Sequence, residues 1–197
     1  MISTLPHYLR TAALTVALLL SSQISHAATW DIDQLMFGLA QTRSAQARFV
    51  EKKSIAMLEL PIESSGELFY SAPDRLEKRT IKPKAENMLV EGDSLRIERG
   101  RQKYRLQLQD YPELAAFIDS IRGTLAGDRK ALERSYQLSL EGGATNWTLQ
   151  LVPNDTRMQQ VITHIRIAGV HNEVRSIEIK QADGDSSQMR IEKLTTP

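Results

Sequence analysis

Residues 110–134 read DYPELAAFIDSIRGTLAGDRKALER, a long helical stretch in a sequence that otherwise alternates in the manner of β-strands. The large apolar residues of this stretch recur with the 3.6-residue period of an α-helix. They are Leu114, Phe117, Ile118, Ile121 and Leu125. Pro112 suits the first helical turn, and Asp110 just before it can cap the free N–H groups there. Gly123 weakens the helix and is a candidate for its end, after which Asp128 can cap a second short helix.

A helix inserted between strands must lay its apolar side on another element, most simply on the open face of the neighbouring sheet. Two interpretations of that contact stay open. The helix either packs permanently into a core, which is the common role of such a stripe, or it forms a lid over an apolar cavity.

On both sides of this stretch, apolar residues alternate with polar ones, which is the pattern of half-buried β-strands. Turn residues separate the runs at hairpin spacing, so we expect sequence neighbours to pair antiparallel. The expected strands number about eleven: 47–57, 62–70, 75–81, 85–90, 94–98, 102–108, 136–140, 147–151, 161–167, 177–179 and 189–191. A first helix, 30–42, precedes them, with Thr29 as its cap. The sequence therefore predicts a mainly β protein with some α-helix.

Each expected strand has one apolar face and one charged face. In the strand 75–81, for example, Arg75, Glu77 and Arg79 share one side, which we expect to be solvated. A sheet of this kind must curl or be covered on its apolar side, and the two helical segments are the available cover.

Residues 1–27 have the features of a signal peptide. Arg10 precedes the apolar run 12–20, which is too short to span a bilayer as a stable helix. Small residues before the end of the segment predict cleavage after Ala27, with cleavage after Ala28 as the alternative. An uncleaved membrane anchor is the other interpretation.

The mature chain, residues 28–197, is long enough for a single domain with its own core. The full sequence has 25 basic and 24 acidic residues, and loss of Arg10 with the signal peptide leaves 24 of each. A formally neutral protein is not suited to nucleic acid or to a strongly anionic membrane as its main partner, because both demand a clustered basic excess. The sequence has no cysteine, so burial alone must hold the core.

No constellation of residues indicates catalysis, a metal site or a cofactor. After the signal peptide the histidines are His164 and His171, whose surroundings suit a strand surface and a turn. Residues 183–185 resemble part of a calcium loop but lack the remaining ligands. We therefore expect no enzyme activity, no metal and no cofactor.

Several short segments, in this order, are similar to those of the periplasmic outer-membrane lipoprotein carrier family, and they cover nearly the whole mature chain. They are residues 47–53 (ARFVEKK), 66–70 (GELFY), 72–76 (APDRL), 91–93 (EGD), 147–153 (WTLQLVP) and 184–185 (GD). The resemblance implies an incomplete, strongly curved antiparallel β-barrel of about eleven strands. Helices would cover it and form a lid over an apolar cavity that holds acyl chains.

If the chain has this architecture, the apolar faces of its strands supply the cavity wall. The candidate wall residues are Phe49, Leu68, Tyr70, Leu76, Met88, Val90, Tyr104, Leu106, Trp147 and Leu149. The candidate lid residues are Leu114, Phe117, Ile118 and Ile121.

The resemblance further implies a periplasmic, monomeric carrier that binds the acyl chains of a lipoprotein or another lipid and moves it between the inner and outer membranes. Its partners would be this cargo, an inner-membrane donor and an outer-membrane acceptor. One position departs from the family. Ala72 stands where well-studied members have an arginine that holds the lid closed, so both kinds of cargo stay open. The alternative is a non-catalytic periplasmic interaction or sensor module on the same fold.

Overall fold

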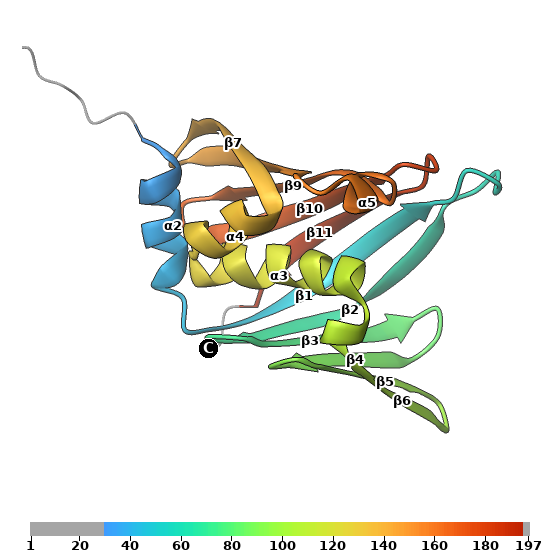
Figure 1. Ribbon diagram of the computed structural model, residues 1–197. Coiled ribbons are helices and arrows are strands. Elements are labelled where there is room, and N and C mark those ends of the chain that lie inside the picture. Colours follow the sequence, from blue (N-terminus) through green and yellow to red (C-terminus); the bar gives the residue numbers. More distant parts are fainter. Residues whose placement is uncertain (1–29, 195–197) are drawn as a thin grey trace, which may run out of the picture.

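A computed structural model describes residues 30–194, and its main feature is one antiparallel sheet of eleven strands. The sheet is open, with the order β6-β5-β4-β3-β2-β1-β11-β10-β9-β8-β7, and it curls so that its two halves face each other (Figure 1). The strands are β1 Ser44–Ser54, β2 Ile62–Ser71, β3 Arg75–Lys82, β4 Glu86–Glu91, β5 Ser94–Arg99, β6 Gln102–Gln107, β7 Tyr136–Gly143, β8 Asn146–Pro153, β9 Ile162–Val170, β10 Glu173–Gln181 and β11 Ser186–Lys193. The predicted fold, an incomplete and strongly curved antiparallel barrel, is confirmed.

Helices fill the inside of this curl. Within the described residues they are α2 Ile32–Ala40, η1 Leu108–Asp110 (a 3-10 turn), α3 Pro112–Ala126, α4 Arg129–Ser135 and α5 Thr156–Gln159. In Figure 1, α3 lies between the two halves of the sheet, with α2 and α4 beside it at one end. These three helices contact one another and form a single layer, so the concave face of the sheet is its helix-covered face.

Helix α3 begins with Pro112 at its first position and continues through Gly123, which is therefore not its end. Gly123 is buried against α4, where an added Cβ would come within 2.8 Å of the Leu132 side chain. The helix ends at Gly127, whose φ of 66° is left-handed. A Cβ at Gly127 would also collide with the backbone oxygen of Met36, so this glycine lets α2 approach α3.

Two of the expected helix caps are wrong and one is confirmed. Asp31 caps α2, while Thr29 lies outside the described residues and before the capping position. Asp110 belongs to η1, so Tyr111 takes the N-cap position of α3. Asp128 caps α4 through its side chain, as expected.

Two further observations concern the chain as a whole. Among residues 30–194, no helix is long and apolar enough to cross a membrane. The predicted signal peptide, residues 1–27, lies outside the described residues.

The strand register puts the alternating apolar residues on the concave face. Phe49 of β1 lies between Gly66 of β2 and Ile191 of β11. A Cβ at Gly66 would collide with the backbone oxygen of Arg79, because the β2–β3 ladder shifts its register there. The glycine thus allows β2 and β3 to pair closely beside Phe49.

The charged side of β3 is only partly as predicted. Arg75, Glu77 and Arg79 do share the convex face, and the Arg79 side chain is 51% exposed. Glu77, however, is only 6% exposed, because Arg75 and Arg79 both donate to its carboxylate. The Arg79 guanidinium also lies 4.5 Å from the centroid of the neighbouring Phe69 ring. The expectation of a solvated face is therefore wrong at Glu77, since its neighbours cover it.

Candidate functional site

Helix α3 lies over the concave face and contacts two separate hydrophobic clusters. The larger one, the β7–β10 cluster, joins the inward residues of β7 to β10 with α2 and α4. Its buried members include Leu35, Leu132, Trp147, Leu149 and Ile165. The smaller one, the β4–β6 cluster, has the buried members Val90, Leu95, Leu108 and Ile118. Phe117 of α3 packs against both clusters and therefore lies at their junction.

The structure distributes the ten predicted wall residues along this concave face. Trp147 and Leu149 are buried in the β7–β10 cluster. Four others belong to the β4–β6 cluster: Leu76, Met88, Val90 and Leu106. Phe49, Leu68 and Tyr70 lie on β1 and β2, which are between the two groups of strands. Tyr104 is on the same face, but at the edge strand β6 it is 48% exposed.

All four predicted lid residues pack toward the sheet from α3. Leu114 and Ile118 contact the β4–β6 cluster, Ile121 contacts the β7–β10 cluster, and Phe117 contacts both. Ile118 is buried, whereas the other three are half-buried. Helix α3 therefore bridges the two halves of the sheet with side chains that are not all fully enclosed.

Two hydrogen bonds reinforce this bridge, one to each half of the sheet. Arg122 Nη1 donates to the backbone oxygen of Gly92 in the β4–β5 turn at 2.7 Å. Tyr136 Oη, at the start of β7, donates to the backbone oxygen of Ala116 at 3.0 Å. Burial raises the pKa of Tyr136 well above its ordinary value, so this hydroxyl stays protonated and remains a donor.

Many large apolar side chains of the concave face are only half-buried, although helices lie above that face. They include Leu68, Leu76, Met88, Ile97, Leu106, Leu138, Leu140, Val174, Ile177, Ile179, Met189 and Ile191. A closed core buries such side chains almost completely, as it does Ile165 at 0% exposure. The described residues thus leave an apolar surface on the concave face partly uncovered.

One ion pair interrupts this apolar surface. Lys78 Nζ lies 2.5 Å from Glu51 Oε2 and 4.9 Å from the centroid of the Phe49 ring. Ser187 Oγ donates to Glu51 Oε1 at 2.6 Å, and Ser64 Oγ donates to Oε2 at 3.4 Å. Burial raises the pKa of Glu51, but the Lys78 charge and these hydrogen bonds outweigh it and hold the pKa below its ordinary value. Glu51 is therefore ionised at neutral pH, and its contact with Lys78 lies within an otherwise apolar wall.

Sequence reasoning missed this pair because it assigned the charged residues to the convex face. The two-residue alternation of the strands could have predicted that both side chains lie on the concave face. Glu51 follows Phe49 by two residues, and Lys78 follows Leu76 by two, so both share the parity of a predicted wall residue.

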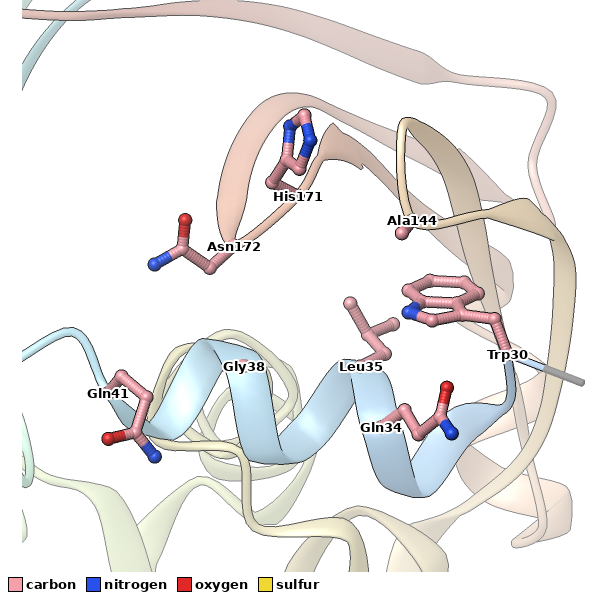
Figure 2. Close-up of a pocket in the computed structure, with 8 residues that line it drawn as sticks. All are labelled: Trp30, Gln34, Leu35, Gly38, Gln41, Ala144, His171 and Asn172. Atoms are coloured by element: carbon pink, nitrogen blue, oxygen red, sulfur yellow. The ribbon is translucent and has the colours of Figure 1, made fainter. Parts of the chain in front are cut away.

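Two pockets are formed by the helices and the turns next to them. One has a volume of about 250 Å³ and lies between α2 and the β7–β8 and β9–β10 turns. Figure 2 shows Trp30 and Leu35 on one side of it, with Ala144 and His171 across from them. The other, of about 370 Å³, lies between α3, α4 and the β2–β3 turn. Neither pocket contains a predicted wall or lid residue.

The histidines lie where the sequence places them. His164 is on a strand, on the side opposite Ile165, and His171 is in the β9–β10 turn with a φ of 54°. Within residues 30–194, no group of three or more histidine, aspartate or glutamate side chains is arranged to hold a metal ion.

An open antiparallel β-barrel with helices on its apolar concave face defines the class of protein, that of the lipoprotein-carrier fold. The sequence matches the family described as "Outer membrane lipoprotein carrier protein LolA-like" over residues 24–192. The chain belongs to this LolA-like family, as its sequence segments predict.

The solved structures that match this chain share little sequence with it. A LolA superfamily protein from Nitrosomonas europaea is 12% identical, with 83% of this chain and 93% of that chain covered and a TM-score of 0.44. An outer-membrane lipoprotein-sorting protein domain from Vibrio parahaemolyticus is 11% identical, with 84% and 92% covered and a TM-score of 0.42. A chain in the Pseudomonas aeruginosa MucA/MucB complex is 16% identical, with 85% and 58% covered and a TM-score of 0.48. No curated protein matches the sequence.

Proposed function

We propose that this protein is a non-catalytic periplasmic carrier that binds the acyl chains of a lipoprotein or another lipid on its concave face, beneath α3. The observation that carries the proposal is the set of half-buried apolar side chains on that face. Burial of an acyl chain contributes about 0.8 kcal/mol per methylene. A chain that replaces water on this surface would therefore bind without a specific polar contact. Membership of the LolA-like family supports the same function.

Entry of an acyl chain requires α3 to move away from part of the sheet. Apart from apolar contacts, the described residues hold α3 to each half of the sheet through one side-chain hydrogen bond. Arg122 donates to one half, and the Ala116 oxygen accepts from the other. Phe117 lies at the junction of the two clusters. An acyl chain that takes the place of this ring would extend along the concave face from one cluster toward the other.

A carrier must also meet a membrane or a membrane protein, and the β1–β2 hairpin offers a surface for this contact. Its tip, residues 55–61, projects from the body of the molecule (Figure 1). Met57 and Leu60 in this tip are 93% and 78% exposed. The Ala56 N–H donates to Asp185 Oδ1 at 2.9 Å, which ties the tip to the β10–β11 turn. Exposed apolar side chains on such a projection suit the interface of a bilayer or an apolar partner site.

The rest of the proposal follows the sequence. The signal peptide, residues 1–27, exports a single mature domain, residues 28–197, to the periplasm. There the protein acts as a monomer, takes cargo from an inner-membrane donor and passes it to an outer-membrane acceptor. The family and the apolar site suit binding and release without chemical change of the cargo.

Mass spectrometry of material extracted from periplasmic protein tests this function, together with uptake of the apolar fluorophore N-phenylnaphthylamine. The carrier function would be supported by lipid or acylated protein that co-purifies. It would also be supported if acylated molecules displace the bound fluorophore. Lipid-free protein that takes up no fluorophore would refute it and favour the interaction or sensor module.

A pair of matched variants locates the site. Met189→Gln places an amide on the concave face and should weaken fluorophore binding. Met57→Gln makes the same change at the hairpin tip, where Met57 is 93% exposed, and should leave fluorophore binding unchanged. Equal affinities in the two variants would place the fluorophore elsewhere.

A further inference from the structure

We propose that the Glu51–Lys78 pair is the polar end of the acyl-binding face, where it recognises the uncharged ester or amide carbonyl group that joins an acyl chain to its head group. The inference rests on the proposed function and adds a substrate class to it. The preferred ligand is an esterified or amidated acyl chain, and a free fatty acid binds less well.

The concave face changes from apolar to polar along the strands, and Lys78 lies at the boundary. Paired residues from β2 to β6 define the first row, which is hydrophobic: Tyr70, Leu76, Val90, Leu95 and Leu106. The second row is hydrophobic apart from Lys78: Leu68, Lys78, Met88, Ile97 and Tyr104. The third row begins with Gly66, Thr80 and Glu86, and Glu86 is ion-paired with Arg99. An acyl chain on the first two rows would thus bring its head-group end to Lys78.

Of the two side chains in this pair, Lys78 is the one with N–H donors left for a ligand. Glu51 already accepts hydrogen bonds from Lys78, Ser187 and Ser64. An ammonium group has three N–H donors, and within the described residues Glu51 is the hydrogen-bond partner of Lys78. The Lys78 side chain is 28% exposed and the Glu51 side chain 16%. The ligand side of the pair therefore presents N–H donors, and it needs an acceptor.

The charge of the pair selects among acceptors. Because Glu51 balances Lys78, the site carries no net positive charge to attract a carboxylate. A fatty-acid carboxylate at Lys78 would also approach the carboxylate of Glu51, which is unfavourable. A carbonyl oxygen can accept a charge-assisted hydrogen bond without that repulsion.

Fold stability alone is a weak reason for placing the pair at this position. Apolar residues of similar volume usually serve a fold as well as a buried ion pair does, because the two charges must be desolvated. A pair that faces the acyl-binding surface is thus better explained by a contact with the ligand.

Competition for bound N-phenylnaphthylamine tests the inference with two ligands of equal chain length, N-methyldodecanamide and dodecanoate, at neutral pH. We expect the amide to displace the fluorophore from the wild type at the lower concentration. Lys78→Met keeps the apolar stem but removes the donor. It should weaken amide binding about tenfold, which is the usual effect of losing a hydrogen bond to a charged group. The fluorophore itself should bind as before, because it makes no such contact.

Lys52→Met is the matched control. Lys52 also pairs with a glutamate, Glu63, but this pair is more than half exposed, so amide affinity should not change. If Lys78→Met does not fold because Glu51 is left unpaired, the double variant Glu51→Gln, Lys78→Met removes both charges and should show the same loss.

The outcomes separate the two proposals. The role of the pair is overturned if a folded Lys78 variant binds the amide as tightly as the wild type does. It is also overturned if dodecanoate competes more strongly than the amide. In both cases fluorophore binding would still support a carrier. A wild type that binds neither fluorophore nor acyl ligand overturns the carrier and this inference with it.

Discussion

Arg122 of α3 donates a hydrogen bond from Nη1 to the backbone oxygen of Gly92 at 2.7 Å and so fastens the helix to the β4–β5 turn. The same guanidinium bonds Asp119 through Nη2 at 2.5 Å, and its side chain is 15% exposed. The opposite half of the sheet is attached through Tyr136 and Ala116. Helix α3 is therefore held on both sides, and Arg122 is its charged contact with the half that carries the β4–β6 cluster.

Replacement of Arg122 by methionine should loosen this end of α3. The change keeps much of the apolar stem but removes a charge-assisted hydrogen bond, so we expect a loss of about 1.5–3 kcal/mol in the free energy of unfolding. Denaturant unfolding measures this loss, and amide hydrogen exchange should accelerate across α3. Arg166→Met is the control, because Arg166 bonds Gln150 at the exposed surface and its loss should matter less. Unchanged exchange in α3 would mean that the Arg122 contact does not restrain the helix.

Phe117→Ala distinguishes a lid from a permanent core. In a closed core this change costs about 3–5 kcal/mol. Phe117 is only half-buried, so we expect a smaller loss of stability together with a clear loss of fatty-acid affinity. Thermal unfolding of ligand-free protein and fluorescent fatty-acid titration measure the two effects. Leu132→Ala, at a site with 1% exposure, provides the reference for a core residue. Two results together would rule out the lid: the Phe117 variant loses as much stability as the Leu132 variant, and the wild type binds no fatty acid.

Local patterns were sufficient to predict much of the fold. The eleven strands follow from the alternation of apolar and polar residues, and α3 follows from the 3.6-residue spacing of Leu114 to Ile121. The errors are at helix ends and in short elements. Asp31 and Thr29 are both good capping residues, and the sequence pattern alone does not decide between them. The four-residue α5 is too short to show a period.

The candidate site was harder to predict because it depends on the curl of the sheet. Parity places Trp147 and Val90 on the same face, but only the curl separates them into two clusters that α3 must bridge. Tyr104 has the correct parity, yet it is exposed because β6 is an edge strand. Lys78 on β3 reaches Glu51 on β1 diagonally across β2. No local sequence pattern in β1 or β3 therefore predicts this contact.

The hairpin tip should contact lipid. A variant with both Met57→Ser and Leu60→Ser removes two exposed apolar side chains, each of which would contribute up to about 1.5–3 kcal/mol if fully buried in a bilayer. We expect a loss of at least tenfold in partitioning to phosphatidylethanolamine–phosphatidylglycerol vesicles, measured by sedimentation. Phe37→Ser, which changes a 73% exposed residue on α2, should have no effect. Equal partitioning of all three proteins would show that the tip does not meet the membrane.

The Glu51–Lys78 pair should make stability depend on pH in one direction. The pKa of Glu51 is held below its ordinary value of 4.5, so ionised Glu51 stabilises the folded protein above that pH. This contribution must decline as the pH falls below 4.5 through the folded-state pKa, because the carboxyl of the unfolded state, which has the higher pKa, binds its proton first and so stabilises the unfolded state. We therefore expect the difference in unfolding free energy between the wild type and Glu51→Gln to be largest near neutral pH and to shrink on acidification. Urea unfolding at several pH values measures it, with Glu63→Gln, from an exposed pair, giving a small difference throughout. A difference that grows on acidification would show that burial, not the Lys78 charge, dominates at Glu51.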